Sequence, residues 1–234
     1  MKDIGNLKYF LGIEVLRSKR GIFICQRKYV LDLLVETVLL DCKPADTPMV
    51  VNHNLQMELN GELADKERYQ RLVGKLIYLS HTRPDIAYAV GVVSQFMHQP
   101  QVAHMEAAQR ILRYLKGTVG HGVLFKTNGH LNVELYTDAD WAGDKGNRRS
   151  TLGYFSLVGG NLVTWRIKKQ KVAALWSAVQ ERIIELLYLS SKDQFAYILT
   201  KAVNRNTFSS CLSKLSIGDP TTQLEGECRK EENK

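Results

Sequence analysis

The spacing of hydrophobic and polar residues changes several times along the chain, and each spacing predicts a type of secondary structure. Residues 8–15 and 21–26 are rich in β-branched and aromatic residues and are separated by a polar turn, which is typical of a β-hairpin. Apolar residues then recur every three or four positions, as they do on one face of a helix. This pattern covers residues 27–38, 69–79, 85–97 and 104–116.

The segment between the first two predicted helices, residues 41–67, has prolines and a glycine among polar residues and favours a long surface connector. After Gly120 the pattern changes to short β-prone runs. These runs are residues 122–126, 131–137, 152–158 and 161–165. Turn residues at 127–130 and 159–160 join neighbouring runs, so we expect a sheet built of hairpins. A last periodic stretch, residues 177–189, predicts a helix.

These elements predict a mixed fold, α+β or α/β, with two domains and a tail. Residues 1–120 would hold the hairpin and the helices, and residues 121–217 the sheet with its later helix. Residues 218–234 are polar and densely charged at their end, which favours a solvated tail. A length of 234 residues is compatible with this division, since a domain has roughly 100 to 200 residues.

Composition narrows the class of protein. The chain is 44% hydrophobic, so most of it can bury a core. The longest apolar run, residues 86–93, is far shorter than the roughly 20 residues of a membrane-spanning helix. The first residues contain no continuous apolar segment of the kind that a secretory signal requires. We therefore expect no membrane partner and an intracellular protein, cytoplasmic or nuclear.

Positive charge is concentrated in one block. The formal net charge is +8, and seven cations but no acidic residue lie between Lys145 and Gln180, with Tyr154 and Trp165 among them. Such a block is typical of a surface that binds a polyanion, although charge alone is equally compatible with an ordinary solvated face. The predicted nucleic-acid-binding residues are Arg148, Arg149, Arg166, Lys168, Lys169 and Lys171.

Two carboxylates, Asp138 and Asp140, follow the predicted strand 131–137. Carboxylates on the end of a rigid strand suit a divalent metal, whereas turn or cap chemistry is the ordinary alternative. Glu181, near the start of predicted helix 177–189, either complements the helix dipole or completes a metal site with Asp138. The second role requires this helix to pack across the sheet.

Six strings resemble, in chain order, the polyprotein of copia-type retrotransposons, and the resemblance runs from residue 1 to about residue 217. The strings are KDIGNLKYFLGIE (2–14), KPADTP (43–48), RLVGKLIYL (71–79), TRPDIAY (82–88), LRYLKGT (112–118) and DADWAG (138–143). The resemblance implies the C-terminal part of a reverse transcriptase followed by a ribonuclease H domain. The first part would comprise the last palm hairpin, the thumb and the connection helices.

The resemblance also implies that this chain alone has no polymerase activity. In the family, the paired aspartates of the polymerase lie on a Tyr-Val-Asp-Asp turn upstream of the segment that begins at Met1. No such turn occurs in these 234 residues.

For the ribonuclease H part, the resemblance implies four carboxylates around two metal ions, Mg²⁺ or Mn²⁺. Asp138 matches the first position and Glu181 the second. The fourth strand, with its aspartate, is missing between residues 185–189 and 194–202, and Tyr197 stands where the family has the last aspartate. A phenol is neutral at pH 7, so we expect that no metal binds tightly.

The leading hypothesis is therefore a truncated, catalytically inactive remnant that binds a duplex or an RNA–DNA hybrid weakly. The lost strands would expose the edge of the strand that carries Asp138 and favour self-association. One alternative is an active metal-dependent ribonuclease H that recruits Asp140, Asp144 or Asp193. Another is a non-enzymatic interaction protein or pseudogene product.

Overall fold

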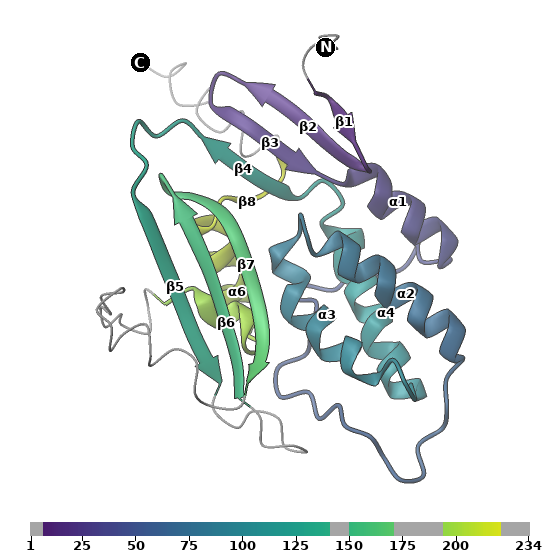
Figure 1. Ribbon diagram of the computed structural model, residues 1–234. Helices are drawn as coiled ribbons and strands as arrows, with labels where there is room; N and C mark the ends of the chain where they lie inside the picture. The colour runs from purple at the N-terminus through teal and green to yellow at the C-terminus, as the bar shows by residue number, and fades with distance from the viewer. Residues whose placement is uncertain (1–6, 141–149, 171–193, 221–234) are drawn as a thin grey trace, which may run out of the picture.

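The computed structural model describes residues 7–140, 150–170 and 194–220. It has a mixed α+β fold with two antiparallel sheets (Figure 1), which confirms the predicted fold class. The first sheet has the order β1-β2-β3-β4-β8 and the second the order β5-β6-β7. The strands are β1 (Tyr9–Phe10), β2 (Ile13–Ser18), β3 (Gly21–Cys25), β4 (Gly122–Lys126), β5 (Val133–Asp140), β6 (Ser150–Val158), β7 (Asn161–Gln170) and β8 (Ile217–Gly218).

The helices up to residue 117 follow the predicted periodicity with one interruption, whereas the helix over residues 205–214 was not predicted. The helices are α1 (Arg27–Glu36), α2 (Lys66–Leu79), α3 (Ala87–Val93), α4 (Val102–Gly117) and α6 (Arg205–Lys214), with 3₁₀ turns η1 (Pro84–Ile86), η2 (Ser94–Phe96) and η3 (Ala196–Leu199). The helix predicted over 85–97 is shorter than expected, because 3₁₀ turns stand at both of its ends. The predicted connector, residues 41–67, contains no helix or strand up to residue 65, but its residues 66 and 67 begin α2.

The pairing of β4 differs from the expected sheet of hairpins. We expected residues 122–126 to pair with the next run along the chain, but β4 pairs with β3 of the N-terminal hairpin, from Gly21↔Lys126 to Cys25↔Gly122. Strand β8 then pairs with the other edge of β4. Alternation of apolar residues identifies a strand but not its partner, so this long-range pairing could not be read from the local pattern.

The second sheet is longer than predicted. Strand β5 runs to Asp140, so Asp138 and Asp140 lie inside the strand and not in a turn after it. Strands β6 and β7 are joined at Gly159 and Gly160, which confirms the predicted turn. The helix predicted over 177–189 and most of the tail lie outside the described residues.

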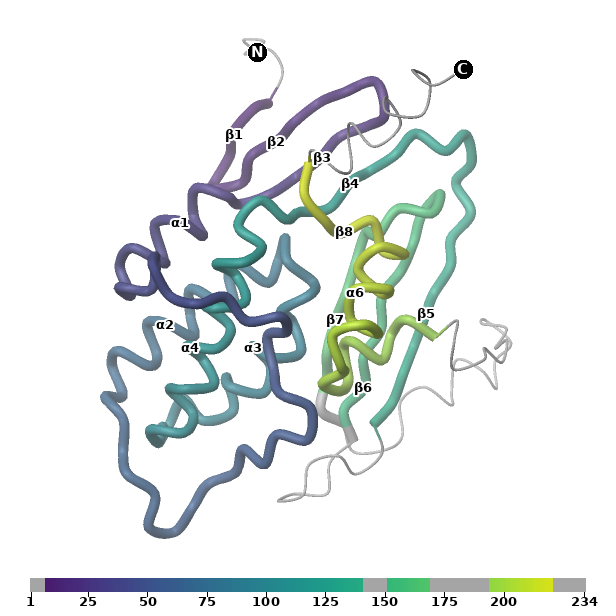
Figure 2. Tube along the Cα trace, turned by 180° about the vertical axis from the view of Figure 1, so that it is seen from behind, coloured from purple at the N-terminus to yellow at the C-terminus, as the bar shows by residue number. Residues whose placement is uncertain are grey.

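One face of the second sheet is packed and the other is open. The side chains of Trp165 and Ile167 on β7 are partly buried toward α3, and the indole Nε1 of Trp165 donates to the carbonyl of Ser80 at 2.9 Å. Segment η3 packs on the same face, at β5 and β6. Helix α6 covers this side of the sheet, and it lies in front of β6 and β7 in Figure 2. The sheet and the helices share a continuous core.

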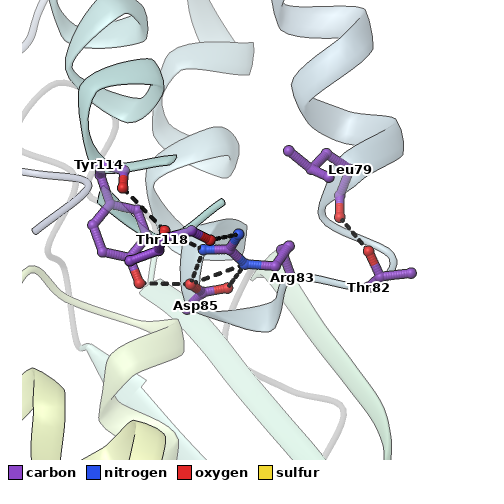
Figure 3. A network of polar contacts seen from close by, with 6 residues as sticks. All are labelled: Leu79, Thr82, Arg83, Asp85, Tyr114 and Thr118. Atoms are coloured by element: carbon purple, nitrogen blue, oxygen red, sulfur yellow. Dashed lines mark hydrogen bonds and ion pairs between the residues drawn. The ribbon is translucent and has the colours of Figure 1, made fainter. Parts of the chain in front are cut away.

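A buried polar network lies between η1 and α4 (Figure 3). Arg83 and Asp85 are 0% and 2% exposed, and their Nη2 and Oδ2 atoms are 2.7 Å apart. The hydroxyl of Tyr114 donates to the same oxygen at 2.6 Å, and Nη1 of Arg83 donates to the carbonyl of Thr118 at 2.9 Å. Burial alone would raise the pKa of Asp85, but Arg83 and the Tyr114 hydroxyl hold it below its usual value. Segment η1 in turn contacts η3.

Candidate functional site

Asp138, the predicted first metal ligand, is engaged by a hydroxyl group. It pairs with Gly153 on β6, and its Oδ2 accepts a hydrogen bond from Oγ1 of Thr200. Thr200 directly follows η3 and is 1% exposed. The carboxylate is therefore partly buried beside a neutral donor that comes from the C-terminal part of the chain.

The close approach of η3 to the sheet depends on a residue without a side chain. A Cβ atom at Gly153 would lie 2.7 Å from Cβ of Leu199 and 2.9 Å from Cγ2 of Thr200. The amide of Gln194 also fixes this segment, because its Nε2 donates to the carbonyl of Thr137 at 2.9 Å. These contacts set the position of the Thr200 hydroxyl on Asp138.

Tyr197, which we expected in place of an acidic ligand, is directed toward α6. The Sγ of Cys211 donates to its hydroxyl oxygen at 3.2 Å. Burial, together with this contact, raises the pKa of Tyr197 above its ordinary value, so the phenol is neutral at physiological pH. The residue of this segment that hydrogen-bonds to Asp138 is Thr200, which follows η3, and not Tyr197.

Asp140 lies in a different polar neighbourhood. Burial and the nearby charge of Asp140 raise the pKa of Tyr88 to about 12. The Tyr88 hydroxyl lies 3.0 Å from Nε2 of His53, a residue of the long connector. Over the ranges 7–140, 150–170 and 194–220, no three His, Cys, Asp or Glu side chains are grouped closely enough to hold a metal ion.

The second predicted ligand and several further residues cannot be placed. Glu181, the alternative ligands Asp144 and Asp193, and the cations Arg148, Arg149 and Lys171 all lie outside the described residues. Of the other predicted cations, Lys169 is described only by its backbone, which pairs with Thr151. Arg166 and Lys168 are exposed on β7.

The register separates these two cations from Asp138. Arg166 pairs with Tyr154 and Lys168 with Leu152, whereas Asp138, Gly153 and Ile167 are aligned across the three strands. Because side chains alternate between the faces of a sheet, the two cations lie on the open face and Asp138 on the packed face. Figure 1 shows the open face toward the viewer, with α6 behind the sheet.

Strand β5 forms one edge of the second sheet, since within the described part of the chain it pairs only with β6. Val133 and Leu135 are 72% and 48% exposed on it. We expect this edge to promote self-association, so the sedimentation coefficient should rise with protein concentration. Val133→Lys with Leu135→Lys should suppress the rise. A monomer at every concentration in the unchanged protein would contradict the prediction.

Thr200 and Gln194 were missed by the sequence prediction. Both lie in segment 194–202, which also contains Tyr197. The sequence does not indicate which distant residues a threonine or glutamine side chain contacts. Thr200 is 62 residues from Asp138 along the chain. The contact arises only because η3 folds back onto β5 and β6.

The chain is similar to polyproteins of plant transposons. It is 47% identical over 171 residues to the retrovirus-related Pol polyprotein from transposon RE1 of Arabidopsis thaliana, and 44% identical over 171 residues to that from transposon RE2. Each match covers 73% of this chain and 12% of the polyprotein. An uncharacterized mitochondrial protein of the same plant is 40% identical over 181 residues, which are 77% of this chain and 75% of that protein.

Two further comparisons add no relative. No protein-family model matches the chain, and no solved structure matches it. Among the helices of the described residues, none combines the length and the apolar character needed to cross a bilayer.

Proposed function

Because the chain belongs to the family of retrovirus-related Pol polyproteins of copia-type transposons, we propose that it is a non-catalytic remnant that still binds nucleic acid. In this proposal residues 1–120 derive from the C-terminal part of a reverse transcriptase and residues 121–217 from a truncated ribonuclease H domain. The chain spans only 12% of the polyproteins from transposons RE1 and RE2, so their other activities do not transfer to it.

The observation that carries the proposal is the placement of charge on opposite faces of one sheet. Arg166 and Lys168 are exposed on the open face, beside the partly exposed ring of Tyr154. Cations that neutralise phosphates supply most of the affinity of non-specific binding, and an aromatic ring adds a surface on which a base can stack. A nucleic acid held there would lie across the sheet from the Asp138 carboxylate, which supports binding without cleavage.

The donor set near Asp138 also favours a non-catalytic protein. Two adjacent divalent ions need several anionic oxygens, but the Asp138 carboxylate already accepts from Thr200 and the Tyr197 phenol contacts Cys211. Within the described residues, these side chains do not fit a two-metal centre. When bound in the family's site, Mg²⁺ or Mn²⁺ would activate a water molecule for hydrolysis.

Binding is tested with a labelled RNA–DNA hybrid and a labelled DNA duplex in fluorescence anisotropy over a range of salt concentrations. We expect weak binding whose affinity falls steeply with salt. The double variant Arg166→Glu with Lys168→Glu should lower the logarithmic salt slope by about two, roughly one for each lost phosphate contact. The matched control reverses two exposed cations on the distant hairpin, Arg17→Glu with Lys19→Glu, and should leave the slope unchanged.

Cleavage is tested on the same hybrid with Mg²⁺ or Mn²⁺. We expect the RNA strand to stay intact, both with the unchanged chain and with Tyr197→Asp, because Tyr197 lies against Cys211 and not against Asp138. Cleavage that disappears in Asp138→Asn would instead establish the active ribonuclease H. Binding that does not depend on salt, or that is unchanged in Arg166→Glu with Lys168→Glu, would refute the proposal that these cations bind nucleic acid.

A further inference from the structure

A groove lies between α2 and α4 and is closed at one end by the end of α1. Its floor is apolar and includes Leu72, Met105 and Leu112. The cavity in it has a volume of about 90 Å³. This space suits one branched aliphatic side chain and is too small for a nucleotide.

The rim of this groove is positively charged. Arg68, Arg71 and Lys75 line it from α2, where spacings of three and four residues place them along one helix face. Lys75 is paired with Glu36, the one carboxylate among the described residues that line the groove. Arg68 and Arg71 are exposed, and neither has an ion-pair partner among the residues that the structure describes.

We infer that this groove binds an acidic peptide segment of a partner protein through one leucine or isoleucine side chain. The aliphatic side chain fills the cavity above Leu72, Met105 and Leu112, and carboxylates one helical turn away meet Arg68 and Arg71. Arginine suits this role because its planar guanidinium can donate two parallel hydrogen bonds to a carboxylate. The inference does not depend on the nucleic-acid surface proposed above.

The lining favours a peptide over a nucleic acid. None of the groove's lining residues, within the part of the chain that the structure describes, carries an aromatic ring. Proteins that hold single-stranded nucleic acid usually provide rings on which bases stack. A phosphate backbone would use the two arginines but would leave the cavity beside the partly buried Met105 unfilled. An acidic segment with one apolar side chain satisfies both the floor and the rim, because it buries apolar area and pairs both charges.

The experiment uses the full chain and a fluorescein-labelled helical peptide that carries one leucine with glutamates three and four residues away. Two companion peptides replace the leucine by alanine or the glutamates by glutamine. We expect the first peptide to bind in anisotropy titrations and both companions to bind at least tenfold more weakly. Binding of the alanine peptide with equal affinity would overturn the inference, because it would show attraction by charge alone.

Two variants and one control locate the site. Arg68→Glu with Arg71→Glu removes the charge of the rim and should weaken peptide binding at least tenfold. Met105→Phe should fill the cavity and weaken it about fivefold, while the thermal midpoint of unfolding shows that each variant is folded. The matched reversal Arg17→Glu with Lys19→Glu should have no effect.

Three further results would overturn the inference. The first is that the peptide does not bind, and the second is that Arg68→Glu with Arg71→Glu binds it as well as the unchanged chain does. The third is that the RNA–DNA hybrid displaces the peptide and also binds this double variant more weakly. The last result would assign the groove to nucleic acid. Nucleic-acid binding on β7 is tested separately, by Arg166→Glu with Lys168→Glu. A negative result for peptide binding in the groove therefore does not affect the proposed nucleic-acid binding.

Discussion

Replacing Arg83 by methionine should lower the free energy of unfolding by about 3–5 kcal/mol, because the change leaves the Asp85 carboxylate buried without its counter-charge. The guanidinium also donates to Thr118, so its removal frees the end of α4 as well. In a chain of this size the thermal midpoint should fall by about 10 °C. Chemical denaturation followed by far-UV circular dichroism measures the free energy directly.

Lys28→Met is the matched control for this prediction. Lys28 and Asp32 form an ion pair at 2.7 Å on the surface of α1, where both side chains are mostly exposed. Solvent screens such a pair, so the control should leave the unfolding midpoint almost unchanged. If Arg83→Met were no more harmful than Lys28→Met, the buried network would not be a main support of the helical region.

Gly21→Ala should have the second large effect and lower the free energy of unfolding by about 2–5 kcal/mol. Gly21 has a φ of +143°, and a Cβ atom there would lie 2.0 Å from the carbonyl oxygen of Phe125. The substitution therefore adds backbone strain to a clash that can be relieved only if β3 and β4 separate. Hydrogen exchange at the amides of β4 should become faster, which places the damage at that pairing.

Gly129→Ala is the control that separates the backbone strain of a positive φ from the steric clash of the added Cβ. Gly129 also has a positive φ, +70°, but among the described residues no heavy atom beyond its two chain neighbours lies within 4 Å of the position that its Cβ would take. This variant should cost only the strain of the left-handed conformation, about 1–2 kcal/mol. Equal losses at Gly21 and Gly129 would show that contact with Phe125 is not the cause.

The helices up to residue 117 could be predicted from the sequence because their burial follows a local period. In α2 one stripe of apolar residues at three- and four-residue spacing is buried, and its members are Tyr69, Leu72, Val73, Leu76 and Leu79. Asp65 begins this helix by accepting a hydrogen bond from the Arg68 amide at 3.0 Å. Both signals lie within one short window, so neither needs knowledge of the rest of the fold.

The candidate site could be predicted only in part, because its contacts join distant segments. The Asp-x-Asp pattern identified Asp138, and the exposed places of Arg166 and Lys168 agree with a solvent-facing block of charge. The register across three strands decides that these cations and Asp138 face opposite ways. Register depends on where β5 ends and β7 begins, and our prediction ended β5 three residues too early.

The order of strands in the first sheet has a consequence for how the chain folds during synthesis. After β3 has been synthesised, about 100 more residues must be added before β4 can pair with it. At ordinary translation rates this takes about 5–20 s. Strand β8 comes roughly 90 residues later still, and closing such long loops slows folding. Until then the nascent hairpin presents the backbone of β3 as an unpaired edge. A ribosome that pauses between β3 and β4 would prolong this state, so chaperone binding to the nascent chain should peak in that interval.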